Sequence, residues 1–172
     1  TIITIYKSLI KIKGKTLISR NINYLKKNGI SNIFVLTGHA HSKVEKEVIK
    51  NFKKKIFLNF TGINSSIVKR ISKTIKFIDT FDYILIMNGD SLYKFNLKKI
   101  LKKTFFNNLD CSFVSTSKII KYGFLKVNQD DKIVSFAKNQ KFDNFQNFSK
   151  HYFYTGMCLI KTNLLEKNIK DI

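Results

Sequence analysis

The stretch DYILIMNGDSLY, residues 82–93, decides the fold of this chain. Its first part, Tyr83 to Met87, is a short run of large apolar residues, which is typical of a strand buried on both faces of a parallel sheet. Two small polar residues around a glycine, Asn88-Gly89-Asp90, then follow. In an open α/β sheet, ligands bind outside the carboxyl ends of the strands. The stretch therefore predicts a buried strand that delivers Asp90 to a crevice, although the same tripeptide also favours an ordinary turn.

Helix-like and strand-like segments alternate on both sides of this stretch. Apolar residues at helical spacing, with capping residues at the ends, predict helices over 15–27, 41–52, 64–75, 96–105 and 161–169. Short β-rich runs predict strands over 32–38, 55–60, 83–87, 110–117 and 152–160, and the pair 122–127 and 132–137 predicts a hairpin.

Several details of these elements are specific enough to be checked. Asn28-Gly29 is expected to end the first helix, and Val44, Val48 and Ile49 are expected to face the core from the second. Asn64 or Ser65 is expected to cap the third helix. The run 83–87 is expected to be a central strand.

Strands separated by helices imply right-handed crossovers and a largely parallel sheet covered by helices on both faces. The hairpin adds an antiparallel insertion in the second half. The chain has 172 residues with 44% hydrophobic content, which suits one compact domain over 1–172.

The net charge of +21 is the most unusual feature of the composition, since 32 Lys and Arg residues oppose 11 Asp and Glu residues. Such a field attracts phosphates, nucleic acid or anionic membranes. Arginine, which reads guanine edges, is present only as Arg20 and Arg70, and the lysines are spread along the chain. We therefore favour a site for phosphorylated small molecules and expect no specific nucleic acid as a partner.

No run of about 20 apolar residues and no signal-peptide pattern is present, so we expect no membrane association and a cytoplasmic location. Cys111 and Cys158 are too few for a disulfide framework or a zinc site, so we expect reduced thiols.

Taken in order along nearly the whole chain, six stretches resemble the sugar-1-phosphate nucleotidyltransferases, also called nucleoside-diphosphate-sugar pyrophosphorylases. They are YKSLIKIKGKTLI, GISNIFVLTGH, TGINSSIVKRI, ILIMNGDSLY, YGFLKVNQDDKIVSFAKN and YTGMCLIKTNLL. TGINSSIVKRISK with MNGDSL looks most like the glucose-1-phosphate cytidylyltransferase branch, with heptose-phosphate and other hexose-phosphate relatives as close competitors. The resemblance implies a Rossmann-like three-layer α/β/α fold of the nucleotide-diphospho-sugar transferase type.

The resemblance also implies a reaction, in which a nucleoside triphosphate and a sugar 1-phosphate form a nucleoside-diphosphate sugar and release pyrophosphate. Two anions must meet, so the task is neutralisation and alignment, which Mg²⁺ and lysines supply. Asp90 matches the metal-binding aspartate of the family. Lys7 matches the lysine of its PKP segment and would neutralise the triphosphate, although Tyr6 and Ser8 replace the prolines.

Further positions match the family's binding residues. Thr61, Gly62 and Asn64, together with Gly89, fall where the family contacts the nucleotide. Gly123, Lys138 and Gly156 fall where it contacts the sugar phosphate, but Ala137 and Asn139 replace the neighbours of that lysine in the EKP motif. Apart from its place in a motif, any single lysine among so many is best explained as a solvated surface charge. Gly123 and Gly156 could likewise be explained by strand packing alone. For Arg70 a solvent role is favoured over a phosphate contact, which the cytidylyltransferase resemblance keeps open.

Two parts of the family pattern are missing from this sequence. The glycine-rich loop that wraps the triphosphate is expected before Lys7, and a second metal-binding aspartate is expected after Ile172. We therefore expect a piece of a longer enzyme, inactive as it stands. A noncatalytic nucleotide or sugar-phosphate binding module and, less favoured, a basic nucleic-acid-binding domain stay open as alternatives, as does assembly into a homo-oligomer.

Overall fold

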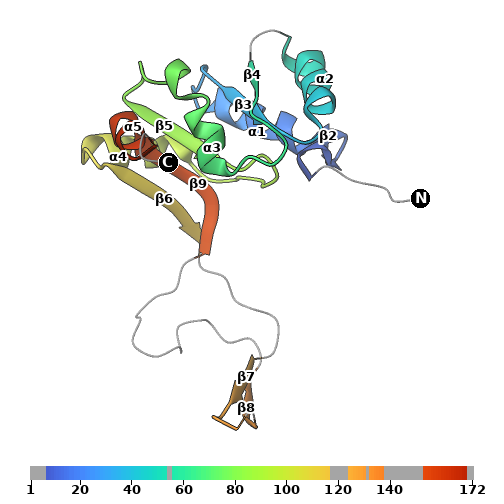
Figure 1. Ribbon diagram of the computed structural model, residues 1–172, viewed down its shortest axis with the longest axis vertical. Coiled ribbons are helices and arrows are strands. Elements are labelled where there is room, and N and C mark those ends of the chain that lie inside the picture. The colour runs from blue at the N-terminus through green and yellow to red at the C-terminus, as the bar shows by residue number, and fades with distance from the viewer. Residues whose placement is uncertain (1–6, 54–55, 117–123, 131, 138–152, 170–172) are drawn as a thin grey trace. The chain divides into compact units, whose positions relative to one another are not determined.

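The computed structural model describes residues 7–53, 56–116, 124–130, 132–137 and 153–169. The chain divides into two compact units, which are Thr1–Ser112 with Cys158–Ile172, called the first unit, and Phe113–Met157, called the second unit (Figure 1).

The first unit begins with a tight hairpin that leads into a capped helix. The 3₁₀ turn η1 (Lys7–Leu9) precedes the short antiparallel strands β1 (Lys11–Ile12) and β2 (Lys15–Thr16). The α1 helix (Leu17–Lys27) follows at once, and the Thr16 hydroxyl accepts a hydrogen bond from the backbone N–H of Ser19. The predicted ending at Asn28-Gly29 is confirmed, since Gly29 has a φ of +86°.

A βαβ unit follows α1, as the alternation of segments predicted. Strands β3 (Phe34–Thr37) and β4 (Phe57–Phe60) pair in parallel, and the α2 helix (His41–Phe52) connects them. Val44 and Val48 are buried, but Ile49 is 47% exposed, so the inward placement of Ile49 was wrong. Phe52 follows Val48 by four residues and therefore lies on the same buried face of the helix. Ile49 comes directly after Val48, and the rotation of the helix from one residue to the next turns its side chain away from that face.

The third helix is shorter than predicted and starts at a different cap. The α3 helix (Ile67–Ser72) is capped by Ser66, whose hydroxyl accepts a hydrogen bond from the N–H of Lys69. The prediction of Asn64 or Ser65 as the cap was wrong, because the Ser65 hydroxyl instead donates to the carbonyl of Thr61 at 2.6 Å. A 3₁₀ turn, η2 (Ile75–Phe77), leads to β5 (Tyr83–Met87), which has the predicted bounds.

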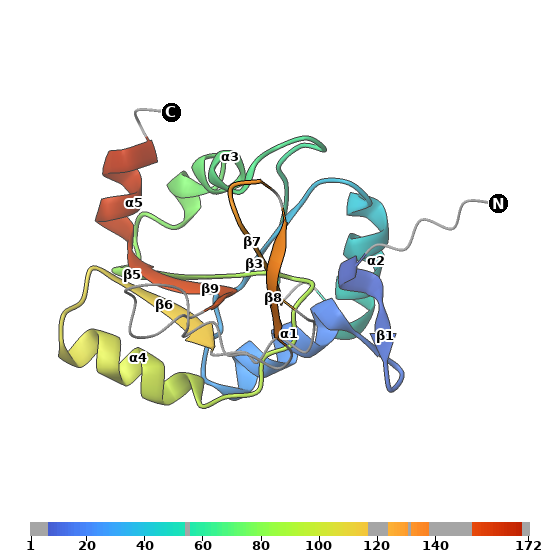
Figure 2. The same ribbon diagram turned by 90° about the horizontal axis from the view of Figure 1, so that it is seen from below.

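A three-stranded sheet with the order β5-β9-β6 contains this decisive strand. Its other strands are β6 (Cys111–Thr116) and β9 (Phe153–Lys161), and the helices α4 (Leu97–Phe106) and α5 (Thr162–Ile169) flank it in the chain. In Figure 2, α1 and α4 lie on one side of the strands of the first unit, and α3 and α5 lie on the other. Among the strands that the structure describes, β5 is an edge strand and β9 the central one, so the central placement of 83–87 was wrong.

The second unit holds the predicted antiparallel insertion. Strands β7 (Phe124–Val127) and β8 (Ile133–Ala137) form an antiparallel hairpin. The side-chain oxygen of Asn128 accepts hydrogen bonds from the N–H groups of Asp130 and Lys132 at 3.0 and 2.9 Å, which closes the turn.

The predicted fold class is confirmed as a mixed α/β arrangement with parallel and antiparallel strands. The core of the first unit is apolar, and Ile22, Val48 and Leu97 are at most 1% exposed. Among the helices described, none has the length and hydropathy that crossing a bilayer would take.

Candidate functional site

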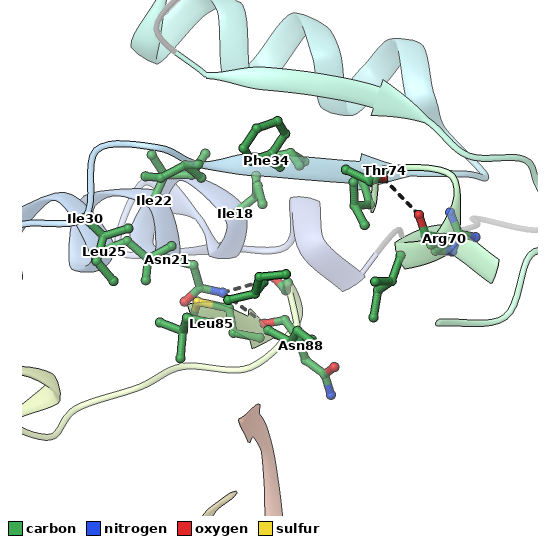
Figure 3. A pocket seen from close by; sticks show the side chains of 18 of the residues that line it. Ile18, Asn21, Ile22, Leu25, Ile30, Phe34, Arg70, Thr74, Leu85 and Asn88 are labelled. Carbon is green, nitrogen blue, oxygen red and sulfur yellow. Dashed lines mark hydrogen bonds between the residues drawn. The ribbon is translucent and has the colours of Figure 1, made fainter. Parts of the chain in front are cut away.

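A cavity of about 1090 Å³ lies in the first unit and is bordered by the full lengths of β3 and β5. Its walls are mostly apolar, with Ile18, Ile22 and Leu25 contributed by α1, Phe34 by β3 and Leu85 by β5 (Figure 3). Polar side chains gather where the two strands end, and they include Lys7, Ser8, His39, Arg70, Asn88 and Asp90. An apolar cavity with a few convergent polar groups is the common form of a small-molecule site.

Lys7 and Asp90 meet at this polar end, although 83 positions of sequence number separate Lys7 from Asp90. The Nζ atom of Lys7 lies 4.0 Å from Oδ2 of Asp90, and their side chains are 80% and 38% exposed. An exposed pair at this distance adds about 1 kcal/mol or less to stability. Both charges therefore remain accessible to a ligand, and the pair contributes little to the stability of the fold.

Asn21 of α1 holds the loop that carries Asp90. Its side-chain nitrogen donates to the carbonyl of Ser91 at 2.9 Å, with longer contacts to the carbonyls of Gly89 at 3.3 Å and Asn88 at 3.4 Å (Figure 3). Asn21 is only 4% exposed, so these are its available partners. The buried side-chain amide of Asn21 thus holds the turn after β5 in place.

Aromatic side chains support the same loop from its far end. The hydroxyl of Tyr24 donates to the carbonyl of Phe95 at 3.0 Å, and its ring lies 6.4 Å from that of Tyr93. Burial raises the pKa of Tyr24, and burial is also the largest cause of the raised pKa of Tyr93, to which the Asp90 charge adds. Both tyrosines therefore stay protonated at neutral pH and act as neutral supports.

Of the predicted nucleotide contacts, Thr61 lies beneath the surface. It is 0% exposed, and its hydroxyl donates to the carbonyl of Thr37 at 2.8 Å, which ties the end of β4 to the end of β3. Gly62 has a φ of +104°, which favours glycine, and Asn64 is exposed. The segment 61–66 is therefore a surface loop anchored by Thr61, and of the predicted contacts on this loop Gly62 and Asn64 are the accessible ones.

The predicted site glycines differ in whether the backbone conformation requires a glycine. At Gly89 an added Cβ would make only ordinary contacts of 3.9 Å with Ile18 and Ser8, and φ is not positive. Gly156 in β9 has a φ of +80°, so its backbone conformation itself favours glycine. Gly156 belongs to the second unit, and Gly123 and Lys138 lie outside the described residues. The structure thus brings Lys7, Gly89 and Asp90 together and leaves the sugar-phosphate candidates as predictions.

Two residues at the site were not assigned a role there from the sequence. Asn21 interrupts the apolar stripe of α1 between Ile18 and Ile22, and a polar residue on a buried face is a signal that could have been used. Arg70 was expected in solvent, but it is half-buried and lines the cavity, as described below.

The donor set at Asp90 suits a cation shared with a ligand. In the part of the chain that the structure describes, no three His, Cys, Asp or Glu side chains are placed to hold a metal ion together. Mg²⁺ commonly binds proteins through one or two carboxylates, with substrate phosphates and water completing its shell. Asp90, an accessible carboxylate that lines the cavity, fits that kind of binding.

Comparisons with known proteins agree with this arrangement. The sequence profile of the family described as "Nucleotidyl transferase" matches residues 3–171. A glucose-1-phosphate adenylyltransferase from Clostridium novyi is 28% identical over 102 residues, which are 56% of this chain and 27% of that protein. The chain thus spans only about a quarter of the length of this curated relative.

Solved structures show the same fold at low sequence identity. HddC from Yersinia pseudotuberculosis, complexed with GMP-PN, superposes with a TM-score of 0.66 at 20% identity, over 94% of this chain and 70% of that one. A putative glucose-1-phosphate thymidylyltransferase from Bacillus anthracis, in complex with a sucrose, gives a TM-score of 0.66 at 16% identity, over 93% and 64%.

These relatives bear adenylyl- and thymidylyltransferase names, so the cytidylyltransferase-like branch stays a prediction. The family match covers almost every residue and includes both Lys7 and Asp90. The chain belongs to the nucleotidyl transferase family.

Proposed function

We propose that the protein of which this chain is part transfers a nucleotidyl group from a nucleoside triphosphate to a sugar 1-phosphate. A phosphate oxygen of the sugar phosphate attacks the α-phosphorus, the bond from that phosphorus to the bridging oxygen breaks, and pyrophosphate leaves. The product is a nucleoside-diphosphate sugar. Family membership and the names of the relatives support this reaction class.

The observation that carries the proposal is the Lys7–Asp90 pair at the polar end of the cavity. The two groups have opposite tasks. Asp90 offers carboxylate oxygens to a divalent cation, proposed to be Mg²⁺, which would neutralise phosphate charge. Lys7 offers a mobile ammonium within reach of the same position, where negative charge accumulates on the departing pyrophosphate.

Asn21 contributes indirectly, because it fixes the backbone from which Asp90 projects. The loop 61–66 lies at the ends of β3 and β4, and we assign the nucleotide contacts to Gly62 and Asn64 on this loop and to Gly89 beside Asp90. The contacts to the sugar phosphate are assigned to Gly123, Lys138 and Gly156 on the basis of the family resemblance alone.

The test is Mg²⁺-dependent nucleotide binding measured by calorimetry on the chain and on Asp90→Asn. The substitution preserves shape and removes the charge, so we expect the Mg²⁺-dependent part of the affinity to be lost while the unfolding temperature stays unchanged. Asp110→Asn is the matched control, because Asp110 also pairs with a lysine, Lys161 at 2.7 Å, and does not line the cavity.

Equal nucleotide affinity of Asp90→Asn and the unaltered chain, with and without Mg²⁺, would sink the proposal. Loss of affinity in Asp110→Asn of the same size would show that the effect is one of general charge and not of the site.

A further inference from the structure

Arg70 makes its hydrogen bonds to one short loop. Its Nε donates to the carbonyl of Ser65 at 3.1 Å, Nη1 donates to the hydroxyl of Thr61 at 2.7 Å, and Nη2 donates to the carbonyl of Ile63 at 3.4 Å. The planar guanidinium thus spans the loop 61–66 with all three of its nitrogens.

Lys73 reinforces the same loop from the following helical turn. Its Nζ donates to the carbonyl of Thr61 at 2.7 Å, which also accepts from the Ser65 hydroxyl. In the described ranges, the ion pairs are Lys7–Asp90, His41–Glu45 and Lys161–Asp110, so neither Arg70 nor Lys73 has a carboxylate partner there. Both cations donate hydrogen bonds to uncharged oxygen atoms of one loop.

This arrangement directs the amide groups of the loop. In a trans peptide, the C=O of one residue and the N–H of the next point in opposite directions. Holding the carbonyls of Thr61, Ile63 and Ser65 toward the cations therefore turns the N–H groups of Gly62, Asn64 and Ser66 away from them. Within the described residues, these three N–H groups donate to no acceptor. In the part of the chain that the structure describes, they are oriented donors without a protein partner.

Close packing against β3 fixes where the loop stands. A Cβ added to Gly38 would lie 2.7 Å from Nη1 of Arg70 and 2.6 Å from the carbonyl oxygen of Gly62, and it would also meet Nη2. No side chain fits between the end of β3 and the loop. The guanidinium thus lies against the backbone of Gly38, and Arg70 lines the same cavity as Asp90. Figure 3 shows Arg70 among the residues that line this cavity.

We propose that Arg70 is the positioning residue of the base-contacting loop and thereby sets the preference for one nucleobase. Unpaired amide donors held in fixed directions distinguish bases by the acceptors on their edges, whereas the charge pair at Asp90 contacts the phosphates that all nucleotides share. The inference rests on the proposed function, because that function places a nucleotide at this loop.

The experiment compares the affinities of the chain for ATP, CTP, GTP, UTP and dTTP, each with Mg²⁺, in Arg70→Lys and in the unaltered chain. Lysine keeps the charge but cannot span three acceptors. We expect the ratio between the tightest and the weakest nucleotide to fall about fivefold to tenfold, the size of one lost hydrogen bond. Gly38→Ala adds a Cβ that would collide with the Arg70 guanidinium and with the Gly62 carbonyl, so it displaces the same loop and is expected to act in the same direction.

Arg20→Lys is the matched control, since Arg20 is the other arginine and donates to a backbone carbonyl, that of Ile12, away from this loop. It is expected to leave the affinity ratio unchanged. An Arg70 that only stabilised the fold would weaken all five nucleotides by one common factor and lower the unfolding temperature. That result, or an unchanged ratio in Arg70→Lys, would overturn the inference.

The outcomes separate the two proposals. If the unaltered chain binds none of the five nucleotides, the proposed function fails and the assignment of base preference fails with it. If the unaltered chain binds nucleotides with a preference that Arg70→Lys and Gly38→Ala both retain, only the inference on Arg70 fails.

Discussion

Asn21 lies on the buried face of α1, where Ile18, Ile22 and Leu25 are its neighbours. A buried amide without partners would cost free energy, but here its donors are satisfied by the carbonyls of the loop 88–91. The side chain therefore couples the position of Asp90 to the packing of a helix that is distant in sequence.

We predict that Asn21→Leu destabilises the chain by about 1–3 kcal/mol, because the carbonyl of Ser91 loses its donor in a part-buried place. The free energy of unfolding in urea measures this. Backbone chemical shifts of residues 88–91 are expected to change at the same time.

Asn51→Leu serves as the comparison for this prediction. The Asn51 amide also donates to a backbone carbonyl, that of Glu47 at 2.8 Å, but in an exposed position where water replaces the lost bond. Its effect is expected within about 0.5 kcal/mol of zero. An equally small effect for Asn21→Leu would show that the amide does not hold the loop.

Among single residues, the sequence could nominate the charged groups but not their supports. Lys7 and Asp90 stand in recognisable segments, and a carboxylate after a buried strand has a physical reason to be at a crevice. Asn21 and Arg70 act through backbone carbonyls of other segments. The break in the apolar stripe of α1 marks Asn21 as unusual, but the partners of both residues depend on tertiary geometry, which no local pattern encodes.

The bounds of helices and strands agreed with the prediction where the apolar pattern in the sequence was long or sharply ended. The α2 helix has the predicted bounds because its apolar stripe runs over three turns, and β5 has them because polar residues end its apolar run. The short α3 helix is different. Asn64, Ser65 and Ser66 are all good capping residues, and the hydrogen bond of Ser65 to Thr61 selects Ser66.

At this scale we predict that Ser66→Ala destabilises the chain by about 1 kcal/mol, since the N–H of Lys69 loses its acceptor at the start of α3. Asn64→Ala, two positions earlier, is expected to change the free energy of unfolding by a few tenths of a kcal/mol at most. Chemical denaturation of the two variants in parallel measures the difference. A larger loss for Asn64→Ala than for Ser66→Ala would return the cap to Asn64.

For the whole molecule, the sequence indicated the class of fold but not the order of its strands. The alternation of strands and helices predicts a parallel sheet, and β3 with β4 forms one. The placement of β5 at an edge could not be predicted, because its uniformly apolar sequence is typical of a strand with neighbours on both sides. In the structure, that apolar surface borders the cavity instead.

The cavity leaves one edge of β3 without a strand among the described residues. Along an extended strand, the N–H and C=O of one residue point to the same side and those of the next residue to the opposite side. The carbonyls of Ile33 and Thr37 accept from Phe57 and Thr61 on the β4 side. The N–H of Val35 and Thr37 therefore face β4, and those of Phe34 and Leu36 face the cavity.

Amide hydrogen exchange, followed residue by residue by NMR, tests this arrangement with an internal control. We predict slow exchange at Val35 and Thr37, where ladder hydrogen bonds must open first, and exchange faster by a factor of about ten or more at Phe34 and Leu36, which water reaches through the cavity. Because the four residues are consecutive, a global opening would affect them equally. Equal protection at all four would mean that this edge of β3 is paired in solution, and the cavity would then not be open to ligands along its length.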